Sequence, residues 1–208
     1  MKEIITNLAL FIVFCIAFSS LTGCSGTQSN TTNGNVVNAT NTANANTQTA
    51  KSDPAAYPLL ASSLADAEFE MLDGTKSKIS DRKGKVLLVN IWGIWCGPCV
   101  AEMPALIAMQ DQYRDKGLEI IGLNIGSDES GTAESADNIK RFIEQKKLNY
   151  TVAISPNAVT NQFYAITKAR VVPQTLVIDR EGRLRGVFIG GGPNIANSMK
   201  EKIEEVIN

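Results

Sequence analysis

The chain has 208 residues, of which 44 per cent are hydrophobic, and a formal net charge of −1. This size and composition fit one ordinary globular domain with additional sequence outside it. Nucleic-acid binding is disfavoured, because 20 Lys and Arg against 21 Asp and Glu leave no basic surplus for phosphate contacts. The absence of His excludes His general bases, His-dependent nucleophile pairs, and the usual zinc and haem ligand sets.

Residues 1–23 have the anatomy of a cleaved export signal. An apolar run over residues 8–18 follows a charged start, and it is too short for a membrane span, which needs about 20 residues. The segment Leu21-Thr22-Gly23-Cys24 resembles the bacterial lipoprotein box, which implies cleavage before Cys24 and attachment of lipid to it. A retained anchor is the alternative, because Glu3 offsets the positive charge of Lys2.

Residues 24–56 are predicted to be the lipidated Cys and a disordered tether. Residues 25–51 contain seven Asn, seven Thr and no aromatic residue, so this stretch buries too little apolar surface to offset the entropy of ordering. A random coil over residues 25–56 spans roughly 30 Å, which would let the domain move near a membrane. A spacer without a partner is favoured over a recognition tail because the stretch consists almost wholly of small and polar residues.

Residues 57–208 are predicted to form one α/β domain. Apolar and acidic residues alternate over 68–71 before the turn Asp73-Gly74, which predicts a leading β-hairpin. The apolar run at 86–92 predicts a central strand covered on both faces. Helical spacing beyond Cys99 predicts a helix that stops at Gly117, and a strand over 118–125 would complete a parallel βαβ crossover.

The rest of the domain is predicted to continue the same sheet. A helix around residues 139–143 and a strand at 151–154 precede a short helical stretch at 158–164. Strands at 174–178 and 183–189 flank a turn at 179–182, and an amphipathic helix closes the chain. This order predicts a mixed central sheet with helices on both faces. Ligands bind such sheets beyond the carboxyl ends of strands, where Cys96 and Cys99 follow the central strand.

Two residues separate Cys96 from Cys99 at the predicted helix start. Unpaired N–H groups and the positive end of the helix dipole stabilise a thiolate there, so Cys96 is the expected nucleophile. Cys99, one turn further and expected to be more buried, would resolve the mixed disulfide.

Three other interpretations of the pair are weaker. A buried, inert pair is disfavoured because Gly97-Pro98 lies between the two thiols. A zinc site needs about four ligands, whereas Cys15 would leave with the signal and Cys24 would carry lipid, so we expect no metal and no cofactor. A purely structural disulfide would close a loop too short for much entropic gain.

Two motifs carry a family resemblance. Trp95-Cys96-Gly97-Pro98-Cys99 resembles the thioredoxin active site, and Val172-Pro173 resembles the cis-proline loop of that superfamily. Cys99 followed by Glu102 and Pro104, with the leading hairpin and the export signal, resembles more narrowly the TlpA/ResA-like thiol-disulfide oxidoreductases of bacterial envelopes. The resemblance implies a thioredoxin-like fold with an N-terminal β-hairpin extension, a redox-active Cys96–Cys99 disulfide, a cis Pro173, and a substrate-binding surface formed by Trp95, Gly97, Pro98, Val172 and Pro173.

The same resemblance implies partners and a location. Substrates would be protein disulfides or dithiols, and a membrane protein would donate electrons. Several relatives reduce the haem-binding Cys pair of apocytochrome c, although Val172 replaces the Thr often found there in those members. We expect a lipid-anchored monomer outside the cytoplasm, in a bacterial cell envelope or periplasm, with the choice of membrane left open.

Two polar residues are expected to differ in role. Asn90 lies six positions before Cys96, where thioredoxins carry a buried acid that moves protons. Glu102, whose counterpart lies in the active site of ResA-like proteins, would supply that function, and the alternative is a solvated helix residue. Trp92 is predicted to lie in the core, and Trp95 on the substrate surface.

The predicted function is reduction of protein disulfides, with three alternatives. A disulfide-forming oxidase stays open, because Gly97-Pro98 does not fix the reduction potential. A peroxidase is disfavoured because Gly93 stands where peroxiredoxins need Thr or Ser, three residues before the attacking Cys. A non-catalytic binding lipoprotein with the same fold is the third.

Overall fold

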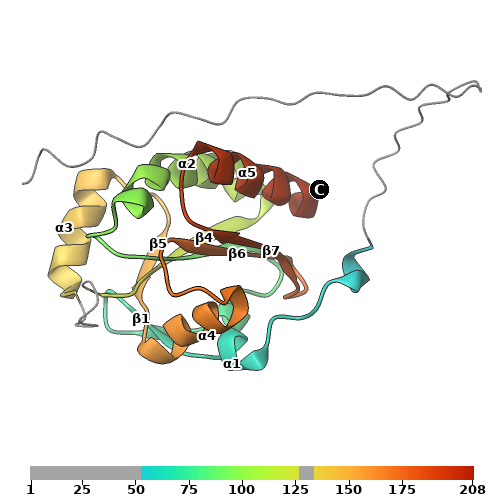
Figure 1. Ribbon diagram of the computed structural model, residues 1–208, viewed down its shortest axis with the longest axis horizontal. Helices are drawn as coiled ribbons and strands as arrows, with labels where there is room; N and C mark the ends of the chain where they lie inside the picture. Colours follow the sequence, from blue (N-terminus) through green and yellow to red (C-terminus); the bar gives the residue numbers. More distant parts are fainter. Residues whose placement is uncertain (1–52, 127–133) are drawn as a thin grey trace, which may run out of the picture. The chain divides into compact units, whose positions relative to one another are not determined.

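The computed structural model describes residues 53–126 and 134–208 (Figure 1). The predicted signal, Cys24 and most of the predicted tether lie outside these residues. The first described element is a single 3-10 turn, η1 (Pro54–Ala56), at the end of the segment predicted as tether. No helix within the two described ranges is both long and apolar enough to cross a bilayer.

The described strands form one sheet in the order β2-β1-β5-β4-β3-β6-β7. β3, β4 and β5 run parallel, whereas β1 and β6 run antiparallel to the neighbouring β5 and β3, and the predicted mixed sheet is therefore confirmed. Strand bounds are β1 (Phe69–Met71), β2 (Lys76–Ser77), β3 (Val86–Trp92), β4 (Leu118–Asn124), β5 (Thr151–Ile154), β6 (Gln174–Ile178) and β7 (Leu184–Ile189).

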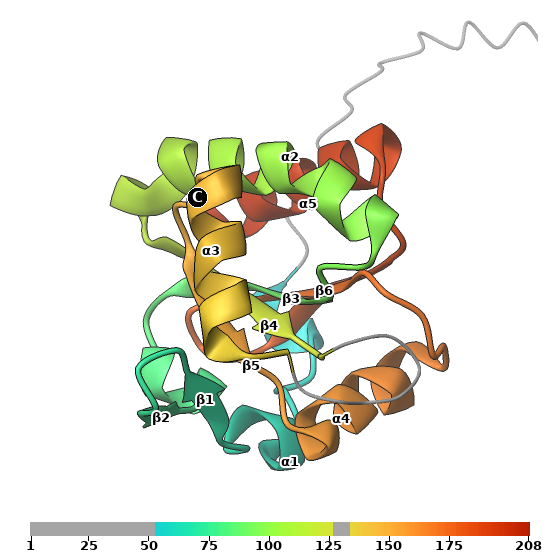
Figure 2. The same cartoon turned by 90° about the vertical axis from the view of Figure 1, so that its left-hand side faces the viewer.

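Helices cover both faces of the sheet, as predicted (Figure 1 and Figure 2). One face packs against α2, α3 and α5, and the other against α1 and α4. Helix bounds are α1 (Ser62–Ala65), α2 (Gly97–Tyr113), α3 (Ala136–Lys146), α4 (Asn157–Thr167) and α5 (Pro193–Ile207), with 3-10 turns η2 (Ile79–Arg82) and η3 (Arg114–Lys116).

The predicted central strand is β3, in which all seven residues are buried. Its side chains alternate between the two helix layers. Leu87, Val89 and Ile91 pack toward α1 and α4, whereas Val86 and Leu88 pack toward α2 and α5. This double burial explains the continuous apolar run.

The leading hairpin is present as β1 and β2, with Phe69 opposite Ser77. Gly74 in its turn has a φ of +85°, a conformation that glycine adopts without a Cβ penalty. β1 pairs antiparallel with β5 and so extends the sheet at that edge. The helix predicted at 158–164 is longer than expected, because α4 runs from Asn157 to Thr167 and ends at the left-handed Lys168.

Candidate active site

The cysteine pair lies where β3 passes into α2, at the carboxyl end of the central strand. Cys96 is the N-cap of α2, and its Sγ accepts a hydrogen bond of 3.2 Å from the backbone N–H of Cys99. Pro98 occupies the first turn, where a missing N–H costs nothing. The first thiol therefore sits at the positive end of the helix, which favours its thiolate once the pair is reduced.

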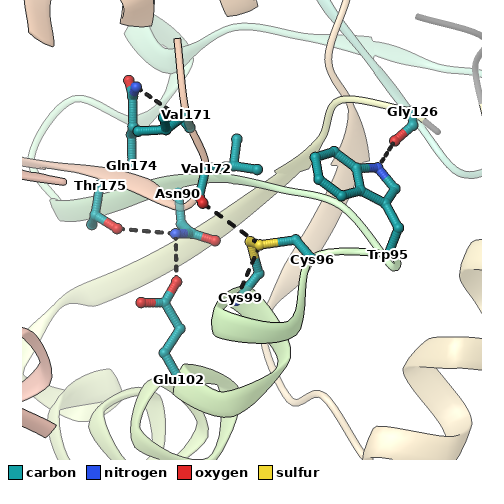
Figure 3. The surroundings of a disulfide bond; sticks show 10 residues. All are labelled: Asn90, Trp95, Cys96, Cys99, Glu102, Gly126, Val171, Val172, Gln174 and Thr175. Atoms are coloured by element: carbon teal, nitrogen blue, oxygen red, sulfur yellow. Dashed lines mark hydrogen bonds between the residues drawn. A yellow bond between two sulfur atoms is a disulfide. The ribbon is translucent and has the colours of Figure 1, made fainter. Parts of the chain in front are cut away.

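Cys96 and Cys99 form a disulfide, as the resemblance implied. Cys99 is 1 per cent exposed and Cys96 is 4 per cent exposed. Cys99 is therefore the more buried of the two, as predicted, although both residues are almost completely buried. Figure 3 shows the pair at the start of α2.

The loop before β6 packs against the pair. The Val172–Pro173 peptide bond is cis, which confirms the expectation for Pro173. The Val172 carbonyl oxygen lies 3.7 Å from Cys96 Sγ (Figure 3). Trp95 and Val171, both about half exposed, flank this contact.

Gln174, which the sequence analysis did not single out, holds this loop in place. Its side chain is fully buried, and Nε2 donates to the carbonyl oxygens of Ala169 at 2.9 Å and Val171 at 2.8 Å. Its Oε1 accepts from the Thr167 hydroxyl at 3.0 Å. A polar residue that opens an apolar strand directly after Pro173 is the signal that could have identified it.

Glu102 points into the protein and not into solvent. Its side chain is 2 per cent exposed, so the alternative of a solvated helix residue is wrong. Asn90 Nδ2 donates to Glu102 Oε1 at 3.0 Å and to the hydroxyl of Thr175 at 3.0 Å. Figure 3 shows Asn90 between the two acceptors. Glu102 Oε2 is buried and has no hydrogen-bond partner within the described part of the chain.

Burial raises the pKa of Glu102 to about 7, and the hydrogen bond from Asn90 opposes this rise. The charge of Glu102 contributes, after burial, to a raised pKa of the Tyr150 hydroxyl nearby. A carboxyl group with a pKa near neutrality can both take up and release a proton at ordinary pH. Glu102 therefore has the properties of a proton-transfer group.

Gly191, also missed by the sequence analysis, lies against three parts of the site. A Cβ on Gly191 would stand 2.9 Å from the Pro98 carbonyl oxygen and 3.4 Å from both Glu102 Oε2 and the Pro173 ring. The loop between β7 and α5 therefore approaches the site through a residue without a side chain. The three consecutive glycines at 190–192 are the sequence signal that could have identified this close approach.

The two Trp residues occupy different environments. Trp92 is 1 per cent exposed and stacks on Phe142 with ring centroids 5.5 Å apart, which confirms its place in the core. The indole of Trp95 lies over Gly93, where an added Cβ would be 2.5 Å from Nε1. The Thr or Ser that a peroxidase would need at this position has no room beside the indole.

Across residues 53–126 and 134–208, no three His, Cys, Asp or Glu side chains gather as a metal site would require. Residues 60–207 match the protein family described as Redoxin. The chain belongs to the Redoxin family. It is a thiol-disulfide oxidoreductase of the thioredoxin type, with Cys96 and Cys99 as its Cys-X-X-Cys pair.

Similar proteins support this assignment. The chain is 32 per cent identical over 136 residues to the thiol-disulfide oxidoreductase ResA of Bacillus thuringiensis subsp. konkukian, covering 65 per cent of this chain and 69 per cent of that protein. It is 30 per cent identical over 125 residues to the thioredoxin-like protein YneN of Bacillus subtilis, covering 60 and 68 per cent. The resemblance to ResA-like oxidoreductases is thereby confirmed.

The fold is also similar to a solved structure. A thiol:disulfide interchange protein of the thioredoxin family from Chlorobium tepidum superposes with a TM-score of 0.57 and 21 per cent identity. The match covers 68 per cent of this chain and 93 per cent of that one. At this identity the likeness establishes the thioredoxin-like fold.

Proposed function

We propose that this protein is an exported, lipid-anchored reductase of protein disulfides. One observation carries the proposal: Cys96 caps α2 beside the Val172 carbonyl of the cis-proline loop, with the buried carboxyl of Glu102 further along the same helix. This arrangement provides a nucleophile, a main-chain edge for substrate and a proton-transfer group.

In the first step, the Cys96 thiolate attacks one sulfur of the substrate disulfide. A mixed disulfide forms, and the other substrate sulfur leaves as a thiolate. The Cys99 thiol then gives its proton to the Glu102 carboxylate and attacks Cys96 Sγ. The second substrate sulfur leaves, the Cys96–Cys99 disulfide forms, and Glu102 returns the proton to a departing substrate thiolate. Two electrons pass from the enzyme dithiol to the substrate.

Substrate would bind across the loop before β6 and the start of α2. The Val172 carbonyl faces Cys96, and the half-exposed side chains of Trp95 and Val171 border it. An extended polypeptide would pair with the main chain at Val172, against Gly97, Pro98 and Pro173. Trp95 would supply apolar contact area beside the reacting sulfur.

The cellular setting of the proposal rests on the sequence. The export signal at 1–23, the lipidated Cys24 and the tether would keep the domain at the outer side of a bacterial membrane, where a membrane protein returns electrons to the pair. Following the resemblance to ResA-like proteins, we propose the haem-binding Cys pair of an apocytochrome c as the substrate and a monomer as the working form.

The first test is the reduction potential of the Cys96–Cys99 pair, measured in a thiol buffer with tryptophan emission as readout. A potential at or below about −230 mV, in the range of thioredoxin and the glutaredoxins, supports a reductase. A potential near about −120 mV, as in a strong oxidant, would replace the reductase with a disulfide-forming oxidase.

A second test separates an enzyme from a binding protein. The unmodified protein should reduce insulin disulfides with a chemical reductant, and Cys96→Ser should abolish the reaction because the attacking thiolate is lost. An unmodified protein that leaves insulin disulfides intact would favour the non-catalytic binding lipoprotein.

The anchor is tested in cells. Cys24→Ala should release the protein from the membrane fraction, because no thiol remains to carry lipid. Cys15→Ala is the matched control, since Cys15 lies in the segment expected to be removed. Full retention of Cys24→Ala, with no lipid mass on the unmodified protein, would contradict the anchor.

A further inference from the structure

Two contacts hold the Trp95 indole, although the residue is 48 per cent exposed. The indole lies over Gly93, where even a Cβ would approach Nε1 to 2.5 Å. Nε1 also donates a hydrogen bond of 2.8 Å to the Gly126 carbonyl oxygen, as Figure 3 shows. The orientation of the indole therefore depends on where Gly126 lies.

Asn124, the last residue of β4, fixes Gly126. Its side chain is fully buried, and Oδ1 accepts a hydrogen bond of 2.9 Å from the Gly126 backbone N–H. Its Nδ2 donates to Glu134 Oε2 at 2.6 Å. The side chain thus joins the residue that holds Trp95 to a carboxylate just before α3.

Glu134 is also influenced by the segment between β3 and α2. Burial raises the pKa of the Glu134 carboxyl group, and the Asn124 amide and the Ile94 main chain of that segment both lower it. Three hydrogen bonds thus form a network that runs from Trp95 through Gly126 and Asn124 to Glu134.

We propose that Asn124 and Glu134 are positioning residues that hold the Trp95 indole beside Cys96, and that they thereby favour exchange with polypeptide disulfides over small disulfides. The inference rests on the proposed function in one respect, namely that Trp95 contacts the substrate. A polypeptide would dock on an indole that is already ordered and would lose less freedom on binding. A small disulfide can reach Cys96 without contacting the indole.

The sharpest variant is Asn124→Asp, which keeps the size and the acceptor for Gly126 but removes the donor to Glu134. Two acidic groups would then face each other, and the repulsion between them would weaken the contact that holds the side chain at position 124. We expect kcat/KM for insulin to fall about fivefold, mainly through KM, as the loss of one hydrogen bond predicts. The rate with hydroxyethyl disulfide should stay within about twofold of the unmodified rate.

Exchanging the two groups should restore the network. In the double variant Asn124→Asp with Glu134→Gln, the new amide donates to the new carboxylate, so the contact between the two positions returns with its direction reversed. The double variant should therefore recover most of the insulin activity. Glu144→Gln makes the same chemical change at an exposed position of α3 and should alter neither rate.

A second readout does not depend on catalysis. In a Trp92→Phe background Trp95 is the sole tryptophan, and this change removes an indole N–H that has no partner among the described residues. Acrylamide quenching of Trp95 emission should rise in Asn124→Asp and return in the double variant. If the unmodified protein does not reduce insulin, the proposed function fails, and quenching alone decides whether the network positions Trp95.

Two results would overturn the proposal: unchanged quenching in Asn124→Asp, or a double variant that recovers neither readout. Because Asn124 is fully buried, Asn124→Asp risks misfolding, and Glu134→Ala then provides the test. Glu134 is partly exposed, so the variant should fold. It should raise quenching and lower insulin activity, while unchanged values for both would count against the positioning role.

Discussion

The ionisation of Glu102 follows from its neighbours. Burial alone would favour the neutral acid strongly, and the single hydrogen bond from Asn90 counteracts part of that effect. Asn90 is itself held by Thr175, which lies directly opposite on β6. The buried acid of thioredoxins is thus replaced by an amide on β3 and an acid on α2 that contact each other.

Glu102 should make the oxidised protein less stable as the pH rises. The pKa is 4.5 for an unperturbed Glu and about 7 in the folded protein. Between these values the folded state binds more protons than the unfolded state, so stability is lost as the pH rises from 4.5 to 7. The loss is about 3 kcal/mol at most. Urea denaturation at several pH values checks this, and Glu102→Gln should abolish that part of the pH dependence. An unchanged dependence in Glu102→Gln would contradict the assignment.

Asn90→Leu should raise the pKa of Glu102 further. The variant removes the one hydrogen bond that lowers this pKa and keeps a side chain of similar size. The pH at which stability stops falling should therefore move above 7, as measured by the same urea titration. Thr175→Val is the matched control, because it removes a partner of Asn90 but leaves the Asn90–Glu102 bond in place. If stability stopped falling at the same pH in Asn90→Leu and in the unmodified protein, the prediction would be wrong.

β7, β6 and α5 are joined by a buried ion group at the end of the sheet away from the cysteines. Arg185 of β7 contacts Asp179 Oδ2 at 3.3 Å, just after β6, and Glu205 of α5 at 2.9 Å. The side chains of Arg185 and Asp179 are 6 and 4 per cent exposed. Because β6 runs antiparallel to β3, its end at Asp179 lies far from the end of β3 that leads to Cys96.

Arg185→Met should lower the free energy of unfolding by about 3 kcal/mol, because it leaves a buried carboxylate without its cation. The reduction potential of the cysteine pair should not change, since the two sites lie at opposite ends of the sheet. Lys76→Gln breaks the exposed Lys76–Glu68 pair and should change the unfolding free energy by less than about 0.5 kcal/mol. If urea denaturation gave equal losses of unfolding free energy for the two variants, the buried ion group would contribute no more to stability than the exposed pair.

The segment before α1 belongs to the folded domain and covers the start of β7. Leu184 donates its N–H to the Pro58 carbonyl at 2.9 Å, and Leu60 donates to Gly182 at 2.8 Å. The Tyr57 ring lies over Arg185, with the guanidinium 4.2 Å from its centroid. Residues 57–60 therefore pack against the end of the sheet opposite the cysteines.

A fragment of residues 53–208 should unfold in one cooperative transition. A fragment of residues 61–208 should be less stable by about 2 kcal/mol, because it loses the buried Leu60 side chain and the main-chain bonds to β7. Urea denaturation of the two oxidised fragments checks the difference. Equal stabilities would show that the domain begins after residue 60.

Most of the fold could be predicted because its signals are local. The continuous apolar run of β3, the helical spacing after Cys99 and the turn chemistry before β7 each depend on residues close in sequence. Cys96 and Cys99 could be identified for the same reason, since three positions separate them. Bounds were less certain where no strong stop signal exists, as at the end of α4.

The sequence by itself determined the element order, the position of the cysteine pair at a helix start and the family resemblance, because composition, periodicity and motif spacing act over short stretches of chain. Only the tertiary structure decided which distant groups meet. The contact between Asn90 and Thr175, 85 residues apart, the burial of Glu102 and the hydrogen bond that holds Trp95 all depend on strand register and helix packing. The raised pKa of Glu102 could therefore not be predicted from the sequence, because desolvation is a property of the packed interior.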